Sequence, residues 1–153
     1  MTLQIASLEA MQALGTALAE VAQPGDVIAL SGDLGAGKST LARAILLALG
    51  FAGEVPSPTF ALILPYDPPE VRIPVIHADF YRLDGAMELD ELGLDAGDPA
   101  LLIAEWPERV GGLDGPDTLE LRIEGTDASE RTITAQAGSN WHARWQQIAG
   151  GVS

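Results

Sequence analysis

The sequence predicts an α/β domain of three layers, in which helices cover a mixed, mainly parallel sheet with a C-terminal antiparallel extension. Two continuous apolar runs, residues 26–31 and 100–104, are typical of strands that are buried on both faces. Residues 118–123 and 131–135 alternate apolar and polar side chains, which indicates an antiparallel pair with one solvated face. The chain of 153 residues suffices for one core, so we expect a single domain over residues 1–153.

The composition excludes several classes of protein. Apolar residues form 47% of the chain and charged residues 20%, which is usual for a folded domain and not for a disordered one. The absence of cysteine excludes disulfides, thiolate zinc sites and cysteine nucleophiles. No apolar run approaches the ~20 residues that cross a bilayer, and residues 1–10 contain no basic side chain, so we expect a soluble, cytoplasmic protein.

The chain is strongly acidic, with 22 acidic residues, 8 basic ones and a formal net charge of −14 at pH 7. Nucleic acids are bound through Lys and Arg contacts that release counterions, so we expect no direct binding to RNA or DNA. A role on nucleic acid would then depend on a partner, although the same acidity could serve solubility alone. The only lysine, Lys38, lies inside the most specific motif of the chain.

Local patterns place the first elements along the chain. Apolar residues recur every three or four positions over residues 7–22, which predicts a helix capped by Ser7. The apolar run 26–31 leads through a glycine-rich loop, residues 32–37, into a second helix over residues 38–49. The chain therefore begins with a helix and continues in the order strand, loop, helix.

Beyond the second helix, apolar runs separated by turn residues predict further elements. These are strands over 59–65, after a proline-rich loop at 56–58, and over 71–78 and 100–104, a short acidic helix over 87–94, and a terminal helix with a stripe of Trp141, Trp145 and Ile148. Pro74 suggests that the strand over 71–78 lies at an edge or bulges there, because proline cannot donate to a sheet ladder. We expect the terminal stripe to pack against the sheet as core.

Residues 32–39 match the phosphate-binding pattern G-x-x-x-x-G-K-[ST] in full, between a predicted strand and a predicted helix. The expected fold is therefore that of a P-loop NTPase. Glycines let the backbone wrap closely and turn its N–H groups toward an anion at a helix N-terminus. Lys38 would add charge at the β- and γ-phosphates, the Ser39 hydroxyl would ligate Mg²⁺, and Thr40 would reach the α-phosphate. The residues predicted to bind the nucleotide are Gly32, Gly35, Ala36, Gly37, Lys38, Ser39 and Thr40.

A magnesium site of this kind also needs an acidic residue at the end of a neighbouring strand. Two residues are candidates, Asp79 after an apolar run that contains the polar His77, and Glu105 after the run 100–104. Both could face the phosphates, one touching the metal and the other acting on the attacking water. A strand end that merely meets solvent would give the same pattern at either position.

Four segments together resemble the TsaE family, the small bacterial ATPases of tRNA threonylcarbamoyladenosine biosynthesis. In chain order the segments are GDLGAGKST at 32–40, PSPTF at 56–60, HADFYRL at 77–83 and EWPERV at 105–110. The first segment is shared by many NTPases, whereas the other three together are specific, and the resemblance covers nearly the whole chain. It implies an ATPase that uses ATP and Mg²⁺, acts on the partner proteins TsaB and TsaD, and reaches tRNA only through them.

The resemblance also implies roles for single residues. Ser39 and Glu105 correspond to the Mg²⁺ ligands of the family, and Asp79 to its catalytic-type aspartate. Lys38 and Thr59 join Asp79 as expected catalytic residues, with Thr59 in a loop that resembles a switch. Where the family often has a threonine near the adenine, this sequence has Met11.

Three other kinds of activity stay open at this point. A small-molecule kinase usually gathers arginines on a lid, whereas the arginines here are dispersed. Their positions are Arg43, Arg72, Arg82, Arg109, Arg122, Arg131 and Arg144. A GTPase is disfavoured because the guanine motif Asn-Lys-x-Asp needs a lysine other than Lys38. A nucleotide-gated adaptor would share every binding residue and differ only in whether bound ATP is hydrolysed.

Overall fold

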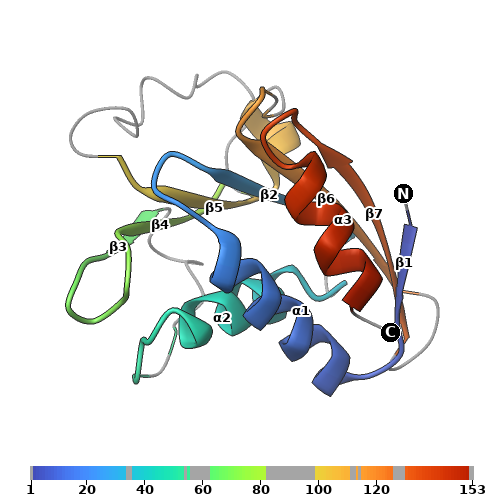
Figure 1. Cartoon of the computed structure of the whole chain (residues 1–153), viewed down its shortest axis with the longest axis horizontal. Coiled ribbons are helices and arrows are strands. Elements are labelled where there is room, and N and C mark those ends of the chain that lie inside the picture. Colours follow the sequence, from blue (N-terminus) through green and yellow to red (C-terminus); the bar gives the residue numbers. More distant parts are fainter. Residues whose placement is uncertain are drawn as a thin grey trace.

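The computed structural model describes residues 2–33, 36–53, 55, 63–81, 99–110, 113, 115–125 and 130–151. These residues form one sheet of seven strands with three α-helices packed on it (Figure 1). The strands are β1 (Thr2–Ile5), β2 (Val27–Gly32), β3 (Ile63–Tyr66), β4 (Val75–Asp79), β5 (Leu101–Glu105), β6 (Thr118–Gly125) and β7 (Arg131–Ala137). The helices are α1 (Leu8–Val21), α2 (Lys38–Ala48) and α3 (His142–Gly151), with a short 3-10 helix, η2, over Pro107–Val110.

The order of strands across the sheet is β1-β7-β6-β2-β5-β4-β3. The centre is parallel, because β2 pairs with β5 and β6, and β5 pairs with β4. Both margins are antiparallel, formed by β3 on β4 at one side and by β6, β7 and β1 at the other. The prediction of a mixed sheet, parallel in its core and extended by a C-terminal antiparallel pair, is confirmed. The carboxyl ends of β2, β5 and β4 therefore meet at one edge.

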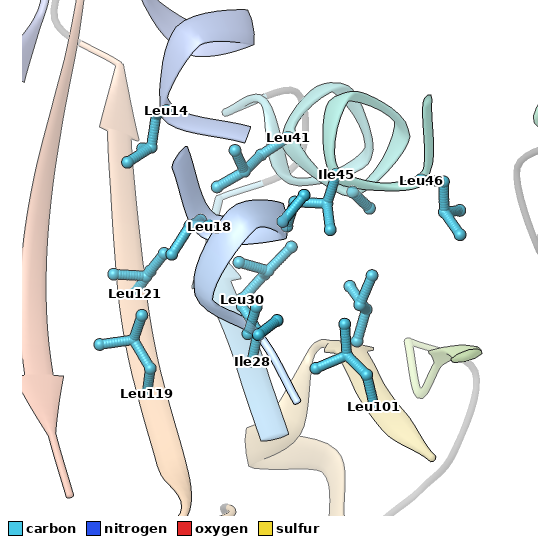
Figure 2. Close-up of a cluster of buried hydrophobic side chains, with 14 of the residues drawn as sticks. Leu14, Leu18, Ile28, Leu30, Leu41, Ile45, Leu46, Leu101, Leu119 and Leu121 are labelled. Atoms are coloured by element: carbon cyan, nitrogen blue, oxygen red, sulfur yellow. The ribbon is translucent and has the colours of Figure 1, made fainter. Parts of the chain in front are cut away.

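The helices pack on one face of the sheet through a continuous apolar core. Figure 2 shows part of it, where leucines and isoleucines of α1 and α2 point toward those of β2, β5 and β6. Fully buried side chains labelled there are Leu14, Leu18, Ile28, Leu30, Leu41, Ile45, Leu46, Leu101, Leu119 and Leu121. Burial of each such side chain stabilises the fold by about 1.5–3 kcal/mol. The core thus holds α2 firmly over β2, and the loop that joins them is anchored at both ends.

Helix α1 approaches α2 closely because of Gly15. A Cβ atom at Gly15 would lie 2.5 Å from the Cβ of Ala44, closer than two carbon atoms can come. The start of α1 is capped as predicted, since the Ser7 hydroxyl oxygen accepts a hydrogen bond from the backbone N–H of Ala10 at 3.1 Å. Helix α1 therefore packs directly against α2.

The terminal helix is tied to the beginning of β2 by a largely buried ion pair. Arg144 of α3 donates to both carboxylate oxygens of Asp26, at 2.7 and 3.1 Å. The guanidinium also lies 3.9 Å from the ring centre of Trp141, whose side chain is fully buried. The predicted packing of Trp141, Trp145 and Ile148 as core is confirmed.

Two expectations about strands were wrong. The strand expected over 71–78 begins only at Val75, and β4 is an interior strand that pairs with both β5 and β3. Pro74 lies just before the ladder, where its missing N–H is not needed and its carbonyl still accepts from the N–H of Leu101 at 2.9 Å. Strand β1 was not predicted, because its four residues are too few for an alternating pattern to stand out.

The three described helices all lie on the same face of the sheet. The opposite face carries a second, smaller apolar cluster that includes Ala78, Phe80 and Leu102. The helix expected over 87–94, the loop at 56–58 and the first part of the run 59–65 lie outside the described residues. No helix in the described part of the chain is long and apolar enough to cross a membrane.

Candidate functional site

The predicted phosphate loop runs from the end of β2 into α2 and is shaped by two glycines. A Cβ atom at Gly32, where φ is +140°, would lie 2.2 Å from the carbonyl oxygen of Ile123, so only glycine fits beside β6. Gly37 is the N-cap of α2, in the left-handed conformation with φ of 115°, and no side chain caps this helix. The N-terminus of α2 is thus a site where backbone N–H groups can bind an anion. Gly35 lies outside the described residues.

The loop is also held from the other side by the C-terminal hairpin. The Nε of Arg131, at the start of β7, donates to the carbonyl of Ala36 at 2.7 Å. Because the C=O and N–H of a trans peptide point in opposite directions, this bond sets the direction of the next N–H, that of Gly37. No local pattern in the sequence marks Arg131, since its partner Ala36 lies 95 positions away.

Lys38 is buried at the first position of α2, with 5% of its surface exposed. Its Nζ donates to the carbonyls of Gly32 and Asp33, both at 2.7 Å, and lies 4.2 Å from the ring centre of Trp106. Burial lowers the pKa of Lys38, and the negative charge of Glu105 and other nearby carboxylates acts in the opposite direction. The ammonium group is therefore positioned at the loop by two carbonyls and one aromatic face.

Ser39 and Glu105, the predicted metal ligands, are in direct contact. The Ser39 hydroxyl donates to Oε1 of Glu105 at 2.9 Å, and the Glu105 side chain is 2% exposed. Among the described residues, no three His, Cys, Asp or Glu side chains cluster closely enough to hold a metal on their own. A hydroxyl and one carboxylate suit Mg²⁺, which takes oxygen ligands and usually completes its shell with phosphate and water.

Asp79 lies beside Glu105, because the register of β4 and β5 sets these two residues opposite each other. Its Oδ1 accepts a hydrogen bond from the backbone N–H of Tyr81 at 2.9 Å. Burial raises the pKa of Asp79, and the negative charge of Glu105 acts in the same direction. Both predicted acidic residues therefore lie at the carboxyl edge of the sheet. Thr59, the third expected catalytic residue, lies outside the described residues.

Trp106 follows Glu105 in an unusual backbone conformation. Its φ is 61°, a left-handed value that is unfavourable for a bulky side chain. The backbone N–H of Trp106 donates to the carbonyl of Leu30 at 3.1 Å, which ties this turn to β2. The Trp106 ring lies against Lys38 on one part and Tyr81 on another, with the Tyr81 ring centre at 4.8 Å. The turn after β5 thus links the ends of β4 and β5, which carry Asp79 and Glu105, to Lys38 of the loop.

A cavity of about 180 Å³ opens beside the start of α2. Its lining residues are Ile5, Ser7, Leu8, Met11, Gly37, Thr40 and Arg131. The cavity lies next to Gly37 and Thr40, and Ile5, Leu8 and Met11 supply the apolar part of its wall.

A glycine loop that opens a helix at the carboxyl edge of a parallel sheet is the arrangement of the P-loop class of α/β proteins. The fold and the loop place this chain in that class. A family model described as "Threonylcarbamoyl adenosine biosynthesis protein TsaE" matches residues 5–133. The chain belongs to the TsaE family.

Individual relatives agree with this assignment. A Streptomyces coelicolor protein named "tRNA threonylcarbamoyladenosine biosynthesis protein TsaE" is 38% identical over 138 residues, which cover 86% of this chain and 93% of that protein. The Bacillus subtilis protein of the same name is 34% identical and covers 86% of this chain and 82% of its own length. The crystal structure of Bacillus subtilis YdiB superposes with a TM-score of 0.78, at 27% identity, and covers 98% of this chain and 94% of that one.

Proposed function

We propose that this chain is the ATP-binding component of the machinery that makes threonylcarbamoyladenosine in tRNA. It would hydrolyse ATP when it acts on a complex of TsaB- and TsaD-type proteins. The observation that carries the proposal is the contact between Ser39 and Glu105 beside the uncapped N-terminus of α2, with Lys38 next to both. Family membership supports the biological setting, because the relatives are named for this tRNA modification.

In this proposal the loop binds the triphosphate of ATP. Backbone N–H groups at Gly37 and in the first turn of α2 would donate to phosphate oxygens, and the ammonium of Lys38 would neutralise the β- and γ-phosphates. Ser39 and Glu105 would hold Mg²⁺, which supplies neutralisation of charge that develops on the phosphate oxygens. The two residues already present their oxygens to each other at 2.9 Å.

The base of the nucleotide would lie in the cavity beside Gly37 and Thr40. Its volume of about 180 Å³ and the apolar side chains of Ile5, Leu8 and Met11 suit an aromatic ring, and Met11 can pack against a flat face. Thr40 lines the same cavity and directly follows Ser39 in the chain, so its hydroxyl would reach the α-phosphate.

Asp79 would orient the attacking water and accept its proton. The carboxylate lies beside Glu105 at the end of β4, and burial raises its pKa toward the range in which a general base works well. Its Oδ1 is already held by the N–H of Tyr81, which restricts the side chain to one orientation.

The proposal assigns no direct contact with tRNA. The net charge of −14 opposes binding to a phosphate backbone. Two of the arginines are also engaged inside the protein, Arg144 with Asp26 and Arg131 with Ala36. The chain would therefore influence tRNA through its partners, by ATP binding or hydrolysis that resets their assembly.

The decisive experiment measures ATP binding and ATP hydrolysis by the chain alone, and then hydrolysis with TsaB- and TsaD-type proteins added. We expect Mg²⁺-dependent binding by the chain alone and hydrolysis that is stimulated by the partners. Binding without any hydrolysis, with or without partners, would indicate a nucleotide-gated adaptor. Phosphate transfer to a metabolite without the partners would indicate a small-molecule kinase.

A further inference from the structure

His77 is a buried polar residue inside β4, and its contact is the carboxylate of the proposed metal site. The side chains of His77 and Glu105 are each 2% exposed, and Nε2 of His77 lies 2.7 Å from Oε2 of Glu105. The register of β4 and β5 sets His77 opposite Ile103, so the imidazole reaches Glu105 diagonally along the ladder. A polar side chain at such a position is unfavourable unless it is hydrogen-bonded, and Glu105 is the partner that His77 has.

The position of the imidazole proton follows from the surroundings of the two ring nitrogens. Nδ1 of His77 is buried and has no hydrogen-bond partner among the described residues. A proton on Nδ1 would therefore be a buried donor without an acceptor, whereas a proton on Nε2 points at a carboxylate oxygen. Nε2 of His77 is thus the ring nitrogen that donates a hydrogen bond to Oε2 of Glu105.

The two oxygens of Glu105 consequently have different partners. Oε2 accepts from His77 and Oε1 accepts from Ser39. Because Oε2 is hydrogen-bonded to the buried imidazole of His77, rotation of the carboxylate about its last bond would break this bond. Oε1 remains directed at the Ser39 hydroxyl, which is the direction a metal ligand must keep.

We propose that His77 is a positioning residue, which acts through Glu105 to present a single carboxylate oxygen, Oε1, together with the Ser39 hydroxyl, to a divalent cation. This inference rests on the proposed function, in which ATP binds with Mg²⁺. Groups that orient a ligating carboxylate typically change metal affinity by about 10- to 100-fold when they are removed. The effect should be confined to the metal, because within the described residues His77 contacts Glu105 rather than the phosphate loop, and it does not line the cavity beside Gly37.

The test compares ATP affinity in excess Mg²⁺ with ATP affinity in EDTA, by calorimetry, for the whole chain and its variants. His77→Leu removes the donor and keeps an apolar side chain in the core. We expect it to weaken binding in Mg²⁺ by about 10- to 100-fold, and to leave binding in EDTA within about threefold of the unchanged protein. His77→Gln should restore most of the Mg²⁺ effect, because its amide nitrogen can stand where Nε2 stands. His77→Asn, whose amide is too short to reach Glu105, should not.

Tyr66→Phe is the matched control, because the Tyr66 hydroxyl is another buried polar atom without a hydrogen-bond partner in the described residues and lies on β3. If His77→Leu loses ATP affinity equally in Mg²⁺ and in EDTA, His77 acts on folding alone and the inference is overturned. If His77→Leu does not fold, the other two variants carry the test. His77→Gln and His77→Asn with the same ratio of ATP affinity in Mg²⁺ to ATP affinity in EDTA would also overturn the inference. Absence of ATP binding by the unchanged protein would overturn the proposed function, and the role of His77 with it.

Discussion

Lys38→Met separates the charge of the loop lysine from its volume. Methionine has a similar unbranched stem and can fill the same space without an ammonium group. In the structure Lys38 is 5% exposed, so truncation to alanine would leave a cavity as well as remove the charge. Methionine therefore tests whether this residue serves nucleotide binding or the fold.

The expected change in stability is small because two large contributions oppose each other. Nζ of Lys38 makes two hydrogen bonds to carbonyls at 2.7 Å. Bonds of this kind contribute about 1.5–3 kcal/mol each. Burial of an ammonium group costs several kcal/mol, and burial is the largest cause of the lowered pKa of Lys38. The free energy of unfolding should consequently change by about 1 kcal/mol or less.

The expected change in ATP affinity is larger. When ATP binds, Nζ would exchange its bonds to the carbonyls of Gly32 and Asp33 for bonds to two phosphates. Only the difference in free energy between these two sets of bonds contributes to ATP binding. A difference of about 2–3 kcal/mol corresponds to a dissociation constant for Mg²⁺–ATP that is about 25- to 150-fold higher. Calorimetry would measure the affinity, and urea unfolding the stability.

Arg43→Met is the matched control for loss of one positive charge on α2, because Arg43 is exposed and lies outside the loop. Arg43→Met should change neither the affinity for Mg²⁺–ATP nor the free energy of unfolding measurably. An ATP affinity of Lys38→Met within about threefold of the unchanged protein would refute the reasoning. A loss of more than about 3 kcal/mol in the free energy of unfolding would show instead that Lys38 is mainly structural.

Three further predictions concern the two acidic residues of the site and the binding of tRNA. Glu105→Gln should weaken ATP binding in Mg²⁺ by at least about tenfold but not in EDTA, as calorimetry would show; equal losses under both conditions would contradict a metal role. Asp79→Asn removes the proposed base, so it should lower partner-stimulated hydrolysis. The variant keeps an oxygen that accepts from the N–H of Tyr81 but removes a charge that burial disfavours, so it should raise the melting temperature at pH 7. Because the pKa of Asp79 is raised in the folded state, the charged carboxylate destabilises the fold above that pKa. The gain in melting temperature from Asp79→Asn should therefore vanish as the pH falls through the raised pKa toward the ordinary value of 3.8. A gain in melting temperature that persists at low pH would refute burial of the charge as its cause. The isolated chain should show no saturable binding of tRNA in filter-binding titrations at low salt, and micromolar binding would refute an indirect role.

The sequence was sufficient to predict the location of the phosphate loop and of both acidic residues. The motif at residues 32–39 is continuous, so it can be recognised from neighbouring positions. Asp79 and Glu105 could be placed together because parallel strands end at a common edge, and apolar runs mark those strands. The sequence misled about the start of β4 and its place in the sheet, because a proline before a strand and a proline within it look alike in sequence.

By itself the sequence determined the class of fold, the loop that would hold phosphates and the acidic strand ends, since each depends on residues that are close along the chain. Only the tertiary structure decided which side chains meet across the sheet. His77 donates to Glu105 from a strand 28 positions away, and Arg131 holds the carbonyl of Ala36 from 95 positions away. The physical reason is that such contacts depend on strand order and register, which are set by burial of the whole core rather than by any local pattern.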